Sequence, residues 1–157
     1  MFVLGLITAL AAIGIIGLIA MPKMGKLFFV KDISRLDFEE TLAVIRKNVA
    51  DNDHGWFITM EKDYNKTYAE KKKGELPFRL VEFKIGNSNH SYRVNRAFPA
   101  VATFMPAAIA VVGEDDGKVA VYRKNTGLMG KFFGGVIRKV MCEEVPVQMN
   151  EILKGAL

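Results

Sequence analysis

The hydrophobic pattern of the chain changes abruptly at Pro22. Residues 2–21 contain no charged side chain, and a helix of this length is about 30 Å long, enough to cross a bilayer core. The segment therefore predicts an uncleaved transmembrane helix. A cleaved signal peptide and a buried core helix are the two alternatives, but no basic residue precedes the apolar run and core helices are seldom apolar all round.

Beyond Pro22 the apolar positions repeat with the periods of strands and helices in turn. Asp37 and Glu40 have the spacing of a capping box, so we expect a helix to begin at Phe38. A second helix, with an apolar stripe from Val145 to Leu153, closes the chain. Strands are expected at 27–33, 56–60, 78–85, 107–112 and 118–123, the last two joined by a hairpin turn at 114–117 and the run at 107–112 forming a central strand.

This order predicts an α+β fold: a mainly antiparallel sheet with helices packed on one face, preceded by a single transmembrane helix. The expected divisions are an anchor at 1–22, a juxtamembrane segment with the first strand at 23–36, and an α+β domain at 37–157. Lys23, Lys26, Lys31 and Arg35 follow the anchor and no basic residue precedes it. The positive-inside rule then predicts a single-pass cell-membrane protein with its domain in the cytoplasm; an extracytoplasmic domain is the alternative.

Net charge and cysteine content limit the classes of partner and cofactor that we expect. The net charge of +5 lies wholly outside residues 2–21, and beside a membrane such an excess favours anionic lipid headgroups over nucleic acid. A single cysteine, Cys142, excludes an internal disulfide and a multi-cysteine metal site. We expect a lipid bilayer and membrane proteins as partners, with no nucleic acid, metal or cofactor.

Two segments are candidates for membrane or partner contact. In the anchor, Gly5 and Ala9 are spaced as small residues that allow close helix packing in lipid. In the segment 128–141, apolar pairs recur every four residues with basic residues between them, as in a basic amphipathic helix on a membrane surface or partner. The alternative is that this segment packs on the domain's own sheet. The contact residues expected there are Lys131, Phe132, Phe133, Arg138 and Lys139.

The sequence contains no catalytic signature. The segment 127–132 is too short for a phosphate-binding loop, and Phe132 stands where a hydroxyl should be. His54 lies in a turn, where exposure to solvent is the usual outcome. The acidic pairs 115–116 and 143–144 suit a turn and a helix start. We therefore expect no catalytic residues.

The order of short motifs from Phe38 to Leu157 resembles the domain of unknown function family 302 (DUF302), which has no established activity. The resemblance implies helices packed on an antiparallel sheet. It also implies that a "G-x-C-N-P" turn and a "P-C-N" turn form one site. The matching segments are Phe38–Glu40, Gly55–Phe57, Glu70–Lys71, Gly86–His90, Pro106–Ala108, Glu114–Gly117 and Val145–Leu153.

The departures from this pattern affect the expected site. Ser88 and Ala107 stand where the family pattern has cysteines, so the thiols of a metal or redox site are missing. If the two turns meet, Ser88, Asn89, His90 and Pro106 would line a pocket for a small polar ligand; a vacated site is the alternative. The leading hypothesis is a non-catalytic, membrane-anchored accessory subunit or binding module of a larger membrane complex. The alternatives are a small-ligand sensor or enzyme using this pocket, and a peripheral anionic-lipid-binding module.

Overall fold

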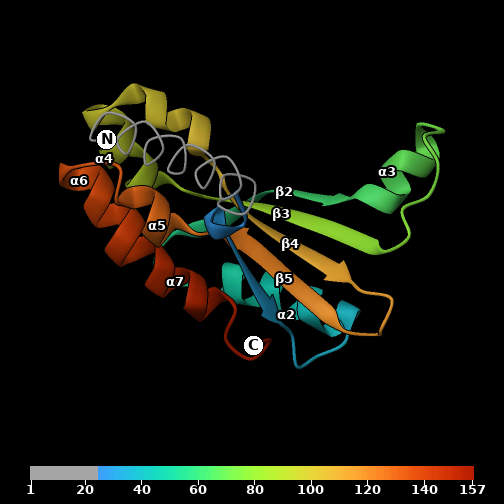
Figure 1. Ribbon diagram of the computed structural model, residues 1–157. Helices are drawn as coiled ribbons and strands as arrows, with labels where there is room; N and C mark the ends of the chain where they lie inside the picture. Colours follow the sequence, from blue (N-terminus) through green and yellow to red (C-terminus); the bar gives the residue numbers. More distant parts are fainter. Residues whose placement is uncertain (1–24) are drawn as a thin grey trace, which may run out of the picture.

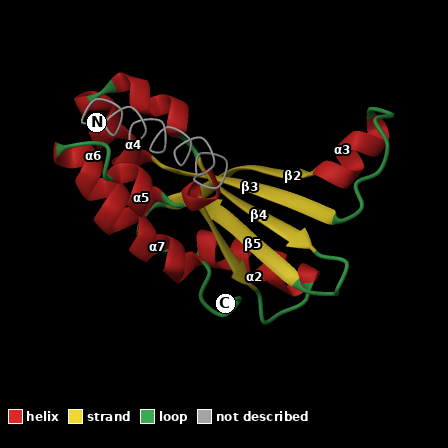
Figure 2. Ribbon diagram, in the orientation of Figure 1, coloured by secondary structure: helices red, strands yellow, loops and turns green. Residues whose placement is uncertain are grey.

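The computed structural model describes residues 25–157, which form a five-stranded antiparallel sheet with helices around it (Figure 1, Figure 2). The strand order is β1-β5-β4-β3-β2. The strands are β1 (Phe29–Ile33), β2 (Trp56–Asp63), β3 (Arg79–Asn87), β4 (Ala107–Gly113) and β5 (Val119–Lys124). This arrangement confirms the predicted α+β class, and β4 is the central strand, as the apolar run at 107–112 indicated.

Six α-helices, two 3-10 helices and one π-helical turn complete the described part of the chain. They are η1 (Gly25–Phe28), α2 (Phe38–Ala50), α3 (Tyr64–Glu70), α4 (Ser88–Ala97), η2 (Pro99–Phe104), α5 (Thr126–Gly130), α6 (Gly135–Lys139), the π-helical η3 (Val140–Glu144) and α7 (Val145–Ile152). Among residues 25–157 no helix is long and apolar enough to span a membrane. The predicted anchor, with Gly5 and Ala9, lies outside the described residues.

Helix α2 shows how local sequence positions the core. The Asp37 side chain accepts a hydrogen bond from the Glu40 amide, and the Glu40 side chain accepts one from the Asp37 amide, so the predicted capping box is present. The helix packs against β2 and β4. Its buried Leu42 and Ile45 belong to the same core cluster as Phe83 of β3. Fully burying such a side chain contributes about 1.5–3 kcal/mol.

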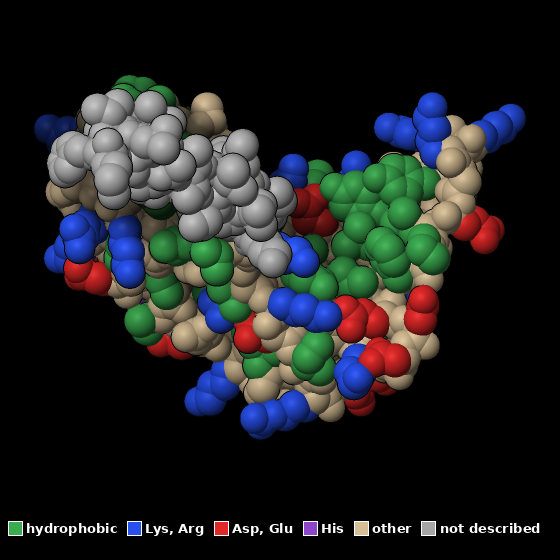
Figure 3. Space-filling model, viewed as in Figure 1, with side chains coloured by type: hydrophobic (Ala, Val, Ile, Leu, Met, Phe, Trp, Pro, Cys, Tyr) green, Lys and Arg blue, Asp and Glu red, His purple; other side chains and the backbone are tan. Residues whose placement is uncertain are grey.

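Most other helices gather at one end of the sheet, where β3 ends and β4 begins. Helix α4 follows β3 directly and packs against α6 and η2, while α5 packs against η3 and α7 (Figure 1). Helix α3 and the turn at 114–117 lie at the opposite end. In the view of Figure 3, apolar side chains gather over the strands beside α3.

The segment 128–141 departs from the expected single amphipathic helix. It is divided into α5, a turn, α6 and the start of η3. Ile137, Val140 and Met141 are buried in the domain's own core, so most of the apolar face packs internally. Gly134 and Gly135 lie at the break, where Gly135 has a φ of 56°, a conformation that suits glycine.

Candidate functional site

A cavity of about 390 Å³ lies at the helical end of the sheet, between α4, η2, η3 and the ends of the strands. Its wall is largely apolar and includes Val94, Val101, Met105, Ala107, Val140 and Val145. Several polar side chains join this wall: Asn87, Ser88, His90, Ser91, Asn95, Lys124 and Thr126. Apolar cavities of this size with a small number of placed polar groups are typical of small-molecule sites.

The junction of β3 and α4 turns His90 toward the interior. Asn87, the last residue of β3, caps α4: its side-chain oxygen accepts a hydrogen bond from the His90 amide at 3.0 Å. Its side-chain nitrogen donates to the His54 carbonyl at 2.8 Å. Asn87 therefore fixes the direction in which α4 leaves the sheet, and His90, in the first turn, is buried with 8% of its surface exposed.

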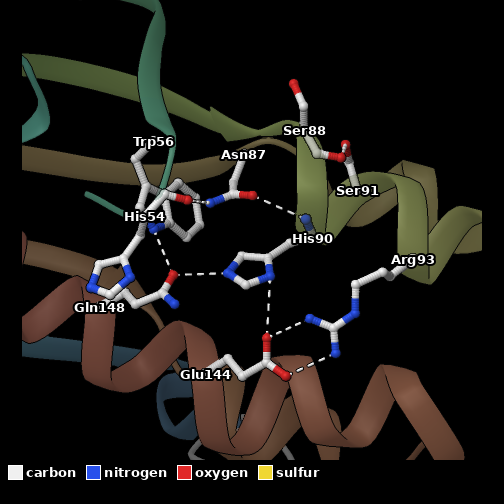
Figure 4. Close-up of polar contacts among 9 residues, drawn as sticks. All are labelled: His54, Trp56, Asn87, Ser88, His90, Ser91, Arg93, Glu144 and Gln148. Atoms are coloured by element: carbon white, nitrogen blue, oxygen red, sulfur yellow. Dashed lines mark hydrogen bonds and ion pairs between the residues drawn. The ribbon is translucent and has the colours of Figure 1, made fainter. Parts of the chain in front are cut away.

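His90 belongs to a polar network that crosses from β2 to α7 (Figure 4). Gln148 Oε1 lies 2.8 Å from both Trp56 Nε1 and His90 Nε2. An indole N–H can only donate, so the atom that it meets on Gln148 is the amide oxygen. The same oxygen must then accept from His90 Nε2, which places a proton on that nitrogen.

The other ring nitrogen of His90 faces a carboxylate. Nδ1 is 3.4 Å from Glu144 Oε2 and is buried without a hydrogen-bond partner. Since Gln148 takes Nε2 and Glu144 borders Nδ1, neither nitrogen is directed at a ligand in the cavity. His90 therefore forms part of the cavity wall and does not have the position of a general base.

Glu144 is held in place by Arg93 of α4. The Arg93 guanidinium donates from Nη1 at 2.6 Å and from Nη2 at 2.9 Å to the two carboxylate oxygens. These bonds lower the pKa of Glu144 below its usual 4.5, with His90 and Lys139 adding a smaller effect.

Glu144 ends the π-helical turn η3, in which the Val145 amide donates to the Val140 carbonyl five residues back. Pro146 accounts for this turn, because proline cannot donate within an α-helix and its ring crowds the carbonyl four residues back.

A pH dependence of stability follows from this ion pair. The lowered pKa of Glu144 contributes stability that is complete above the unfolded-state pKa and is lost as pH falls through the folded-state pKa. We expect Glu144→Gln to remove this contribution, so its stability deficit relative to wild type shrinks below about pH 4.5. Urea unfolding between pH 7 and pH 2 measures it. Arg93→Met should remove the same acid-dependent step, and parallel profiles for wild type and Glu144→Gln would contradict the assignment.

Lys124 brings a positive charge to the cavity wall at the end of β5. Its ammonium donates to the main-chain carbonyls of Phe104 at 2.8 Å and Pro106 at 3.3 Å. Burial lowers the pKa of this ammonium because the charged form loses water, while the charge of Glu82 acts in the opposite direction. Lys124 is thus a partly buried cation held by neutral groups.

Comparisons with known proteins identify the fold and the family. The family model for the domain of unknown function DUF302 matches residues 29–156. The chain belongs to the DUF302 family. A crystal structure of an uncharacterised conserved DUF302 protein from Bacillus stearothermophilus has the same fold, with a TM-score of 0.69 and 13% identity over 83% of this chain and 98% of the other. No curated protein matches the chain.

The two turns expected to meet in a DUF302 domain do lie at the same cavity. Ser88, His90 and Pro106 line it, and so does Ala107, which stands where the family pattern has a cysteine. Asn89 is not among the lining residues and is exposed. Ser88 points away from His90 (Figure 4), so the two side chains do not form a nucleophile–base pair. That these residues bind a ligand remains a prediction.

Three residues important to this DUF302 site were missed by sequence reasoning. Trp56 and Gln148 contact His90 from β2 and α7. Lys124 reaches the cavity because β5 extends one residue beyond the strand expected at 118–123. Alternation along β5 gave no signal for Lys124, because it places this residue on the face opposite Val121. Nothing local to residue 148 indicates a partner on β2.

The expected contact residues of the segment 128–141 separate into two groups in the DUF302 domain. Lys131, Phe132, Arg138 and Lys139 are exposed, and Phe132 has 74% of its surface accessible. Phe133 is instead half-buried and packs edge-on against Phe104, with ring centroids 6.1 Å apart. Phe133 thus belongs partly to the domain's own packing.

Proposed function

We propose that this DUF302 domain is a binding module that holds a small, largely apolar molecule in the cavity at the end of its sheet, without transforming it. The observation that carries the proposal is the cavity itself: about 390 Å³ enclosed mainly by apolar side chains, with few polar groups at its wall. A non-catalytic role is supported by His90, whose ring nitrogens face Gln148 and Glu144.

Trp56 offers a direct test, because it is the single tryptophan of the chain and lines the cavity. Bromine quenches indole fluorescence on contact. We expect bromooctanol or bromooctanoate to quench Trp56 saturably in the full-length protein held in phosphatidylcholine vesicles. The vesicles avoid a detergent that would compete for the cavity.

Ala107→Phe is expected to weaken this binding at least about tenfold, a loss of about 1.4 kcal/mol, because the added ring occupies the cavity. Ala69→Phe is the control, since it adds the same ring at an exposed position of α3 that does not line the cavity. The proposal fails if neither compound quenches saturably, or if Ala107→Phe binds both as wild type does.

The membrane setting predicted from residues 2–21 is part of the proposal. Leu27 and Phe29, which closely follow that segment, have 57% and 60% of their surfaces exposed. Asn125 ties this start of the domain to the cavity end, because its side chain donates to the Leu27 carbonyl and its amide to the Phe28 carbonyl. An anchor at residues 2–21 would therefore hold the cavity end toward the bilayer, with the domain proposed to face the cytoplasm. Resistance of the full-length protein to alkaline extraction from membranes tests the attachment.

An accessory role in a larger membrane complex is the wider form of this proposal. It is supported by the small residues Gly5 and Ala9 in the predicted anchor and by the exposed Phe132 beside Lys131. A stoichiometric complex that survives mild detergent, and that dissociates in Gly5→Ile, supports it. A monomer in mild detergent would contradict the accessory role and leave the cavity function standing. Salt-sensitive binding to anionic vesicles, lost in Lys131→Glu, would instead indicate direct lipid contact.

A further inference from the structure

The ammonium of Lys124 is incompletely satisfied by the protein. An ammonium group has three N–H donors, and two of them reach the carbonyls of Phe104 and Pro106. Within residues 25–157, no carboxylate forms an ion pair with this side chain. The carboxylate of Glu82, which acts to raise the pKa of Lys124, already accepts a hydrogen bond from the Tyr64 hydroxyl at 2.9 Å. One donor and one positive charge are thus left over.

This surplus charge stands beside apolar space. Lys124 lines the cavity together with Val101, Met105 and Ala107, while its ammonium is held in position by main-chain groups. Burying a cation without an opposite charge is costly, which is why burial lowers the pKa of Lys124. A ligand anion at this point would offset the cost and gain a charge-assisted hydrogen bond.

We propose that the cavity takes alkyl carboxylates, with the carboxylate on the Lys124 ammonium and the hydrocarbon chain in the apolar space. This inference rests on the proposed function and names its ligand class. A single ammonium with one free donor matches a monoanion, whereas doubly charged phosphates are usually bound by arginine forks or several main-chain amides. At roughly 30 Å³ per non-hydrogen atom, the volume of a water molecule in the liquid, the cavity has room for about a dozen such atoms.

Paired probes test the charge separately from the cavity. Bromooctanoate and bromooctanol share one hydrocarbon chain and differ in charge at one end. In the full-length protein in phosphatidylcholine vesicles, quenching of Trp56 should show the acid binding at least about tenfold more tightly than the alcohol. In Lys124→Met this preference should disappear, with alcohol binding unchanged.

Two further variants control for general charge and for folding. Lys84→Met removes a neighbouring positive charge that is not part of the cavity wall, and it should keep the preference for the acid. Lys124→Arg retains the cation and should keep most of the preference, which covers the case that Lys124→Met folds poorly. Unchanged binding of the alcohol to Lys124→Met shows that the cavity is intact.

The outcomes separate this inference from the proposed function. Equal binding of acid and alcohol to the wild type would overturn the role of Lys124 while the cavity function stands. Persistence of the preference in Lys124→Met, or its loss in Lys84→Met, would also overturn it. Absence of saturable quenching by either compound would overturn the proposed function together with the inference.

Discussion

Replacing Gln148 with leucine is expected to lower the free energy of unfolding by about 2–6 kcal/mol. Gln148 Oε1 is the acceptor for both Trp56 Nε1 and His90 Nε2. Trp56 and His90 are buried, with 6% and 8% of their surfaces exposed. Leucine has a similar size but no acceptor, and each buried donor left unpaired costs about 1–3 kcal/mol. Urea unfolding followed by the fluorescence of Trp56 and by circular dichroism measures the change.

Gln148→Glu is the matched control for this substitution. A carboxylate retains oxygen acceptors for both donors, so it should recover most of the lost stability at neutral pH. A leucine variant as stable as the wild type would show that the network between β2, α4 and α7 contributes little. A loss of equal size in both variants would assign the effect to packing at position 148.

Replacing Gly130 with alanine should destabilise the protein by about 1–3 kcal/mol, the usual cost of overpacking a core position. A Cβ atom at Gly130 would lie 2.7 Å from Cys142 Sγ and 2.7 Å from Met141 Cβ. Helix α5 would therefore have to move away from η3, which carries Cys142 and Met141 and forms part of the cavity wall. The change in free energy of unfolding by urea measures the cost.

Gly127→Ala in the same helix provides the opposite expectation. Its Cβ would meet only Asn125 Oδ1 at 3.7 Å and Pro146 Cγ at 4.0 Å, which are ordinary contacts. Alanine at this position should be neutral or stabilise by up to about 1 kcal/mol, because it reduces the freedom of the unfolded chain. If both alanine variants behave alike, the close approach of α5 to η3 is not what makes position 130 sensitive.

Local signals account for the parts of the fold that the sequence predicted well. The capping box of Asp37 and Glu40, the turn at 114–117 and the apolar run at 107–112 each depend on residues a few positions apart. The break within 128–141 was missed because apolar spacing continues across it, while the start of α6 depends on the glycine at 135. That the turns containing Ser88 and Pro106 lie close together was predicted from the family resemblance, and no periodicity in the chain indicates it.

The chemistry of the site depends on contacts between residues distant in the chain. Gln148 is 58 residues away in sequence from His90 and 92 residues away from Trp56, and it contacts both. Lys124 owes its environment to the main-chain carbonyls of 104 and 106, which have no side-chain signature. The sequence therefore located part of the cavity wall, whereas the groups that orient His90 and the cation beside the cavity emerge only in the folded chain.

The π turn η3 sets the rotation of everything beyond it. The segment from Gly135 to Ile152 runs as α6, η3 and α7 in succession, and a π turn is equivalent to one residue inserted into an α-helix. Removing one residue from Val140–Glu144 would restore a regular helix and turn α6 relative to α7 by about 100°. Ile137, before the turn, and Met149, after it, could then no longer both face the core. The packing of the domain thus depends on the one extra residue that the π turn adds to the last helix. Insertions or deletions within 140–144 should be tolerated far less well than substitutions.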